Sequence, residues 1–212
     1  MYLICLDLEG VFTPEIWINI ALKTGIEELK ITTRDEPNYE KLMDKRIKIL
    51  KEKGITLTQI QEIIKNMDLL PGAKEFIDWL RENTQFIIVS DSFIEFTKPL
   101  MKKLGYPTIF CHELIINEDN FIVGYELRLR DMKENTIIAI KKLNFKVIAI
   151  GDSYNDIGML KQADLGILFN PPLNVVEDYP QFQVLNHYDQ LKQVISNYLG
   201  LHEEELAYYN IK

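Results

Sequence analysis

The sequence predicts an α/β protein: a doubly wound, Rossmann-like, mostly parallel sheet with a small all-helical insertion after the first strand. Three observations support this fold class. From about residue 70 onward, short apolar runs alternate with segments of helical periodicity, which is typical of βαβ crossovers. Three apolar runs end in acidic or small polar residues. Residues 14–69, in contrast, carry helical patterns and no strand pattern.

The first strand is predicted at residues 2–6, a short apolar run that leads directly into Asp7-Leu8-Glu9-Gly10. The run is partly β-branched or aromatic and is closed by two acidic residues and a glycine, as expected of a buried strand that enters a turn. Ligands of an open parallel sheet bind beyond the carboxyl ends of its strands, so Asp7 and Glu9 lie where chemistry is expected. Taken alone, the two carboxylates could also cap a turn or the next helix.

The segment after this turn is predicted to fold into three helices, at about 14–24, 38–53 and 58–66. Thr13 as N-cap and Pro14 in the first position open the first helix. Thr58 and Gln61 have the spacing of a capping box at the start of the third. An insertion that leaves the crevice and returns to it can cover a site, as a lid does. We therefore expect an α/β core at 1–13 and 70–212 and a substrate-recognising helical cap at 14–69.

Downstream of Pro71-Gly72, helices and strands are predicted to alternate. The helices are expected at about 73–82, 93–104, 133–143, 155–163 and 188–198. The strands are expected at about 86–89, 108–111, 145–150 and 165–169, with a hairpin or irregular pair within 114–130. Residues 201–212 form a polar, Glu-rich tail, and the sequence does not decide whether it is ordered.

The composition is that of an ordinary globular protein, with 212 residues, 47% hydrophobic and 26% charged. A formal net charge of −8 argues against a general nucleic-acid binder, which needs a basic surface. Cys5 and Cys111 lie in apolar runs and are expected to be buried free thiols in a reducing compartment. No apolar stretch approaches the roughly 20 residues of a membrane helix. These features predict a cytoplasmic protein that binds neither membrane nor nucleic acid, and they leave a homodimer open.

Two later strands also end in polar groups that are able to face the same crevice. The strand at 145–150 leads into Asp152 and Asp156, which together with Asp7 would form a cluster of hard oxygen ligands. Such a cluster needs a counterion, and Mg²⁺ prefers a few carboxylates together with water and phosphate oxygens. The alternative for Asp152 and Asp156 is helix capping after Gly151.

The strand at 86–89 ends in Ser90 and Asp91, where a hydroxyl and exposed backbone amides can bind a phosphoryl oxygen. Lys133 begins a predicted helix, whose amino-terminal end already favours an anion. Its alternative is an ordinary surface lysine. Together, a carboxylate nucleophile, a metal, a hydroxyl and a lysine make a phosphoryl-transfer site.

In this order and setting, the motifs resemble the four motifs of the haloacid dehalogenase superfamily. The residues that carry the resemblance are Asp7-Leu8-Glu9-Gly10-Val11, Ser90, Lys133 and Gly151 to Asp156. The helical insertion is similar to the cap of the phosphoserine phosphatase branch. Residues 6–11, 14–17, 32–35, 72–79 and 151–156 resemble a subgroup whose members combine phosphoserine phosphatase and phosphoserine:homoserine phosphotransferase activity.

This resemblance implies a role for each matching residue. Asp7 would be the nucleophile that forms an aspartyl-phosphate, and Glu9 would be the general acid and base. Mg²⁺ would be held by Asp7, the backbone carbonyl of Glu9 and Asp152, with Asp156 supporting them. The phosphoryl-binding residues would be Ser90, Asp91, Lys133 and Asn155.

The resemblance also places Glu15 and Arg46 where phosphoserine phosphatases bind the substrate ammonium and carboxylate. The pair suits an amino acid phosphate, since Arg grips a carboxylate with two parallel hydrogen bonds. The alternatives are a favourable acid in the first turn of its helix for Glu15 and a solvated helix face for Arg46. Most superfamily members carry Asp where this chain has Glu9, which changes the geometry of proton transfer but keeps the acid.

The resemblance thus implies a Mg²⁺-dependent phosphatase of L-phosphoserine, with water or L-homoserine accepting the phosphoryl group. Three alternatives remain: a different small phosphomonoester as substrate, a receiver-like module that holds phosphate on Asp7, and a noncatalytic binding protein. His112, His187 and His202 show no metal-ligand spacing and are expected to have no role.

Overall fold

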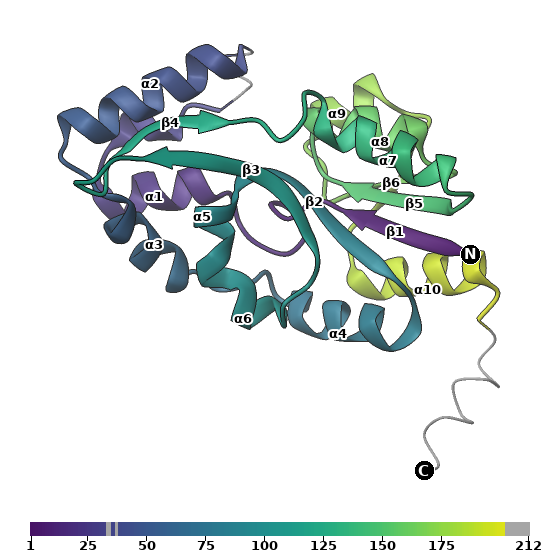
Figure 1. The fold of residues 1–212 in the computed structure, drawn as a ribbon. Helices are drawn as coiled ribbons and strands as arrows, with labels where there is room; N and C mark the ends of the chain where they lie inside the picture. The colour runs from purple at the N-terminus through teal and green to yellow at the C-terminus, as the bar shows by residue number, and fades with distance from the viewer. Residues whose placement is uncertain (33–34, 37, 202–212) are drawn as a thin grey trace.

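The computed structural model describes residues 1–32, 35–36 and 38–201, and its centre is one seven-stranded sheet (Figure 1). The strand order is β4-β3-β2-β1-β5-β6-β7, and every pair is parallel except β3 with β4. The strands are β1 (Tyr2–Leu6), β2 (Phe86–Phe93), β3 (Ile109–Ile116), β4 (Ile122–Glu126), β5 (Lys146–Gly151), β6 (Leu165–Phe169) and β7 (Gln183–Leu185). The predicted doubly wound α/β class is confirmed.

Side chains alternate across the sheet and divide the core into two layers. Ile4 and Leu6 of β1 face a layer that holds α4 and α10, whereas Cys5 faces α7, α8 and α9 on the other side (Figure 1). The helices are α1 (Ile16–Thr24), α2 (Tyr39–Glu52), α3 (Leu57–Lys65), α4 (Ala73–Asn83), α5 (Ile94–Thr97), α6 (Met101–Leu104), α7 (Met132–Lys142), α8 (Ile157–Gln162), α9 (Leu173–Asp178) and α10 (Tyr188–Leu199). Short 3-10 helices are η1 (Glu27–Lys30), η2 (Lys98–Leu100) and η3 (Tyr154–Asp156). Both cysteines are free and buried, as predicted.

The order of the strands creates the crevice. The chain passes from β1 to β2 on one side and later to β5 on the other, so β1 lies at the point where the winding direction reverses. In doubly wound sheets ligands bind at this point, outside the carboxyl ends of the strands. Asp7 and Asp152 directly follow β1 and β5. Strand β2 continues to Phe93, past its predicted end at residue 89, so Ser90 lies inside it, where the pairing with β3 is irregular.

Helix starts in the insertion differ from the prediction for identifiable reasons. The first helix begins at Ile16, not at Pro14, because Thr13 is buried in the turn, where its N–H donates to the Leu8 carbonyl at 3.1 Å. The capping box of α3 is formed by Thr56 and Gln59, two residues before the predicted pair. The helix starts early enough to bury Leu57 in the core.

The β3–β4 hairpin, predicted as a hairpin or irregular pair within 114–130, also supports the helical insertion, and this contact was not predicted. Strand β4 packs against α2, and the hairpin turn reaches α3 (Figure 1). There the Asn120 carbonyl accepts a hydrogen bond from the Leu57 N–H at 2.8 Å, and its side chain accepts from the Thr58 N–H at 2.9 Å. The cover over the crevice is thus made of helices that are braced by a hairpin from the sheet.

Three further elements depart from the prediction. The predicted helix at 93–104 is divided into α5, η2 and α6, because Pro99 lacks the N–H that a continuous helix requires. Helix α9 and the short edge strand β7 were not predicted.

The predictions for residues 33 and 34 and for the tail from residue 202 onward, including His202, fall outside the described residues. Within the described part, no helix is long and apolar enough to span a bilayer.

Candidate active site

The ends of β1, β2 and β5 and the helices above them enclose one cavity of about 330 Å³. Strand register fixes its floor: Leu6 pairs with Ile88 of β2 and Ile150 of β5, and the Asp7 N–H donates to the Ile150 carbonyl at 2.9 Å. All but one of the predicted site residues line this cavity, namely Asp7, Glu9, Glu15, Arg46, Ser90, Asp91, Lys133, Asp152 and Asn155. The exception is Asp156, which lies behind it.

Lys133 is a buried cation among buried carboxylates. Its Nζ lies 2.9 Å from Asp7 Oδ2 and 2.8 Å from Asp156 Oδ1. A third carboxylate, that of Asp91, lies 3.6 Å away. Burial alone would lower the pKa of Lys133, but the three carboxylates hold this pKa well above its ordinary value. The lysine is therefore charged and points at Asp7, and it is not the solvated surface residue of the alternative interpretation.

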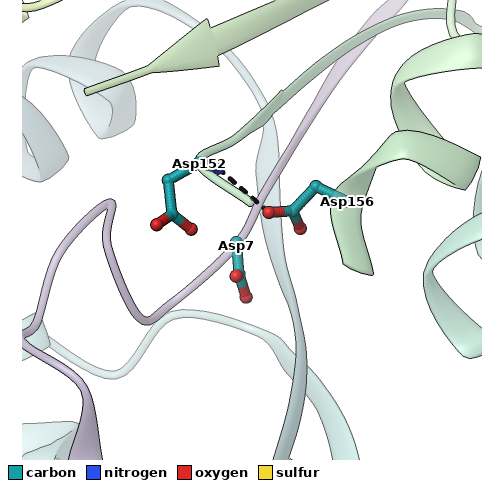
Figure 2. A group of neighbouring side chains, drawn as sticks. All are labelled: Asp7, Asp152 and Asp156. Atoms are coloured by element: carbon teal, nitrogen blue, oxygen red, sulfur yellow. Dashed lines mark hydrogen bonds between the residues drawn. The ribbon is translucent and has the colours of Figure 1, made fainter. Parts of the chain in front are cut away.

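Asp7, Asp152 and Asp156 form the acidic cluster that the sequence predicts (Figure 2). One carboxylate oxygen of each lies within 4.8 Å of the other two. Asp156 has no exposed surface, and both of its oxygens are engaged: Oδ1 with Lys133, and Oδ2 as acceptor from the Asp152 N–H at 2.9 Å and the Ser153 N–H at 3.0 Å. Asp156 thus orients the loop after β5 and leaves the crevice to the other two aspartates.

Asp152 lacks a cationic partner, since no Lys, Arg or His of the described residues lies within ion-pair distance of it. Burial and the negative charge of Asp156 raise the pKa of Asp152 to about 7. Burial, with Asp156 and Asp152, also raises the pKa of Asp7, against the opposing effect of Lys133. A divalent cation between Asp7 and Asp152 would supply the missing positive charge, so this set of oxygen donors fits Mg²⁺.

Gly10 allows Asp152 to take this position. Its φ is +76°, and a Cβ at Gly10 would lie 2.3 Å from Asp152 Cγ. Gly10→Ala is therefore expected to displace the Asp152 carboxylate and to lower both Mg²⁺ affinity and activity by at least about tenfold, since misplaced ligands or reacting groups are costly.

A matched control separates this clash from backbone strain. Gly54 has a similar φ of +67°, with nothing within 4 Å of an added Cβ. Gly54→Ala should cost only about 1–2 kcal/mol of stability and leave turnover intact. Mg²⁺ titration of both variants, followed by calorimetry and activity, checks the prediction, and equal Mg²⁺ affinity in both would contradict it.

The predicted phosphate-binding residues lie together beside Lys133. The Ser90 side chain is buried, and its Oγ accepts a hydrogen bond from the Ser92 N–H at 3.2 Å. Asn155 Nδ2 donates to Asp91 Oδ2 at 3.0 Å. Burial would raise the pKa of Asp91, but Lys133, His112 and Asn155 outweigh it and lower this pKa to about 2.

Sequence reasoning missed two neighbours of Asp91. His112, which was expected to have no role, is buried on β3 with Nε2 3.8 Å from Asp91 Oδ1, and its Nδ1 accepts from the Arg128 N–H at 3.2 Å. Tyr39 begins α2, and its hydroxyl donates to the Asp91 carbonyl at 3.3 Å. Neither contact has a sequence signal, because each joins segments that are distant along the chain.

Glu9 lies on the side of the cavity that faces the insertion. Its Oε2 accepts a hydrogen bond from the Ile16 N–H at 2.8 Å, at the start of α1. Burial and the neighbouring Glu15 carboxylate raise the pKa of Glu9 to about 8. At neutral pH Glu9 is therefore mainly protonated, as a general acid must be.

Arg46 is buried in the cavity wall, not solvated as the alternative interpretation held. Its guanidinium stacks 4.5 Å above the Trp17 ring, and one terminal nitrogen donates to the Ile31 carbonyl at 2.7 Å. Its Nε is buried without a hydrogen-bond partner among the described residues. A buried donor without a partner is costly, whereas the Arg46 side chain as a whole also lines the cavity.

The comparisons with known proteins agree with this chemistry. A family model for haloacid dehalogenase-like hydrolases matches residues 3–164. The chain is 53% identical to phosphoserine phosphatase ThrH of Pseudomonas aeruginosa, over 91% of this chain and 94% of that protein. It is 52% identical to a phosphoserine phosphatase of Pseudomonas syringae pv. tomato, over 89% of this chain and 80% of that protein.

A solved structure has the same fold. The crystal structure of phosphoserine phosphatase from T. onnurineus in complex with NDSB-201 superposes with a TM-score of 0.70 at 25% identity, covering 92% of this chain and 94% of that one. Fold, site geometry and sequence similarity lead to the same conclusion. The chain belongs to the haloacid dehalogenase-like hydrolase family.

Proposed function

We propose that this enzyme is a Mg²⁺-dependent phosphoserine phosphatase that works through an aspartyl-phosphate on Asp7. The observation that carries the proposal is the position of Asp7. Its carboxylate lies 2.9 Å from the Lys133 ammonium and beside Asp152, in a cavity whose far side holds Glu9 with its raised pKa. The similarity to two phosphoserine phosphatases supports the choice of substrate.

The reaction requires two displacements at phosphorus. In the first, an oxygen of Asp7 forms the new bond to phosphorus while the bond to the serine oxygen breaks, and protonated Glu9 gives its proton to that oxygen. In the second, water attacks the same phosphorus, Glu9 takes the proton of that water, and Asp7 leaves as a carboxylate. Lys133 and Ser90 hold the phosphoryl oxygens throughout.

The proposed metal residues are Asp7, Asp152 and the backbone carbonyl of Glu9, with Asp156 as their support. When bound, Mg²⁺ would neutralise charge that develops on the phosphoryl oxygens. The proposed phosphoryl-binding set is Ser90, Asp91, Lys133 and Asn155. Asp91 acts in this set through its contacts to Lys133 and Asn155, because its own carboxylate would repel a phosphate.

Two charged residues above the cavity explain selectivity for an amino acid phosphate. Arg46 lines the cavity with its positive charge and would bind the substrate carboxylate, and Glu15 would bind the substrate ammonium. In the proposed division of the chain, both belong to a cap at 14–69, and the catalytic residues belong to a core at 1–13 and 70–212.

Arg46→Ala is expected to lower kcat/KM for phosphoserine by about ten- to hundredfold, since hydrogen bonds to charged groups contribute roughly 1.5–3 kcal/mol. Phosphoethanolamine, which lacks the carboxylate, provides the control, and its kcat/KM should change little. A substrate panel with wild type, Arg46→Ala and Arg46→Lys measures both. An equal loss for the two substrates would assign Arg46 to the fold and not to recognition.

We propose L-homoserine as a second acceptor for two reasons. The sequence resembles the subgroup that combines phosphoserine phosphatase with phosphoserine:homoserine phosphotransferase activity, and it is 53% identical to ThrH. Homoserine also presents the same ammonium and carboxylate as serine. The test is phosphoserine turnover with and without homoserine, following free phosphate and phosphohomoserine separately. Transfer predicts phosphohomoserine at the expense of phosphate. Turnover without phosphohomoserine would restrict the enzyme to hydrolysis, and no Mg²⁺-dependent turnover at all would refute the proposed function.

Another small phosphomonoester is the second candidate for the substrate, and sugar phosphates in the same panel separate it. A receiver-like module is disfavoured by Arg46 and Glu15, which have no function in holding phosphate on Asp7. Fast turnover of the aspartyl-phosphate would exclude that module.

A cytoplasmic location and a homodimer are also proposals, to be checked by cell fractionation and by the mass of the protein in solution.

A further inference from the structure

In the irregular stretch of β2 from Ser90 to Ser92, here called the phosphate-binding turn, one peptide group is held at both ends. The Asp91–Ser92 peptide accepts a hydrogen bond through its carbonyl from the Tyr39 hydroxyl, at 3.3 Å. Its N–H, on Ser92, donates to Ser90 Oγ at 3.2 Å. Because a peptide group is planar and trans, its C=O and N–H point in opposite directions, and fixing one fixes the other.

The N–H end sets the hydroxyl of Ser90. Only 1% of Ser90 is exposed, and its oxygen is occupied as an acceptor by the Ser92 N–H. Among the described residues, that hydroxyl donates to no protein group, so its hydrogen is available to an anion in the cavity. Rotation of the peptide would withdraw the Ser92 N–H and free the Ser90 rotamer.

The carbonyl end depends on the helical insertion. Tyr39 is the first residue of α2, and its ring packs edge-on against Tyr125 of β4, with centroids 5.8 Å apart at 87°. Hairpin and helix thus aim the Tyr39 hydroxyl at the turn. Tyr39 also lines the cavity itself. Helix α2 carries Arg46 as well, so one helix contacts both the proposed carboxylate site and the phosphate-binding turn.

We propose that Tyr39 is a positioning residue: through the Asp91–Ser92 peptide it orients the Ser90 hydroxyl for the phosphoryl group. The inference rests on the proposed function, in which Ser90 binds that group. It adds a contact by which the placement of α2 over the cavity is transmitted to the phosphate site. Substrate recognition by α2 and phosphoryl binding by the sheet would then be coupled through one hydroxyl.

Tyr39→Phe removes only the oxygen that makes this contact. Inorganic phosphate is the probe, and its dissociation constant is measured by calorimetry in the presence of Mg²⁺. The loss of one hydrogen bond predicts phosphate binding about three- to tenfold weaker, with kcat for phosphoserine reduced in parallel. Tyr125→Phe is the matched control, because the Tyr125 hydroxyl makes no hydrogen bond to any described residue. The Tyr125→Phe variant should bind phosphate as tightly as wild type does.

Ser90→Ala separates positioning from direct contact. If Tyr39 acts through Ser90, Tyr39→Phe should have no further effect on phosphate affinity in the Ser90→Ala background. The inference is overturned if the effect persists undiminished there, as direct contact predicts, or if Tyr39→Phe binds phosphate like Tyr125→Phe. Turnover of phosphoserine by the wild-type enzyme is measured in the same series. If the enzyme is active but the Tyr39 inference fails, the proposed function still holds. Wild type without any Mg²⁺-dependent turnover of phosphoserine would overturn both.

Discussion

Asp7→Asn is expected to reduce phosphoserine turnover by at least about ten-thousandfold, because the amide cannot form the acyl-phosphate bond. The substitution is mild in shape. The Asp7 Oδ1 that accepts from the Leu8 N–H at 2.7 Å can remain an oxygen, and the volume is unchanged. The measurement is steady-state release of phosphate, together with thermal unfolding to show that the variant is folded.

Asp164→Asn provides the control for the loss of a structural carboxylate. Asp164 also accepts a backbone hydrogen bond, from the Val147 N–H at 2.8 Å, and pairs with Lys141 at 3.1 Å, but it lies outside the cavity. Its variant should keep near wild-type kcat. Phosphoserine turnover retained by Asp7→Asn at more than about one per cent of wild type would contradict the nucleophile assignment.

Lys133→Met is expected to impair both stability and catalysis. Removing the ammonium leaves Asp7 and Asp156 buried beside each other without the cation that pairs with both. Removing one partner of a buried ion pair costs about 3–5 kcal/mol of unfolding free energy. Without the Lys133 ammonium to stabilise the negative phosphoryl oxygens, kcat should fall by about a thousandfold. Denaturant unfolding and kinetics on the same preparation measure the two effects.

Lys141→Met on the same helix is the matched control. Lys141 pairs with Asp164 at the surface, where such pairs contribute about 1 kcal/mol or less. We expect full activity and a small change in unfolding free energy. If Lys133→Met behaved like Lys141→Met in both assays, the buried charge cluster would have no part in the reaction.

The floor of the cavity could be predicted from the sequence because its signals are local. Asp7, Ser90 and Asp152 each follow an apolar run, and a parallel sheet brings such strand ends together. Each of these predictions required only a strand boundary and a residue type.

The wall that the insertion contributes could be predicted in position but not in its packing. The sequence places Arg46 on a helix, but its burial against Trp17 depends on how α2 folds back over α1, which no short pattern encodes. The same holds for Tyr39 and His112, which meet Asp91 across 52 and 21 residues of chain respectively. These contacts are set by tertiary packing and not by periodicity.

The error at the first helix has a chemical origin. Thr13 and Pro14 have the residue types of a helix start, but the Ile16 N–H is satisfied by the carboxylate of Glu9 instead. A proposed catalytic residue therefore supplies the hydrogen bond that an ordinary N-cap would make. Local helix rules fail here because the helix end is part of the site.

The most direct test of the account is to detect the phosphoryl group on the protein. Enzyme mixed with phosphoserine labelled in its phosphoryl group and quenched in acid within milliseconds should carry one labile label per chain, located on the peptide that contains Asp7. In samples quenched at later times, the label should leave Asp7 at the rate of turnover, whether water alone or added homoserine accepts the phosphoryl group. Turnover without any label on Asp7, or label on a different residue, would contradict the central claim.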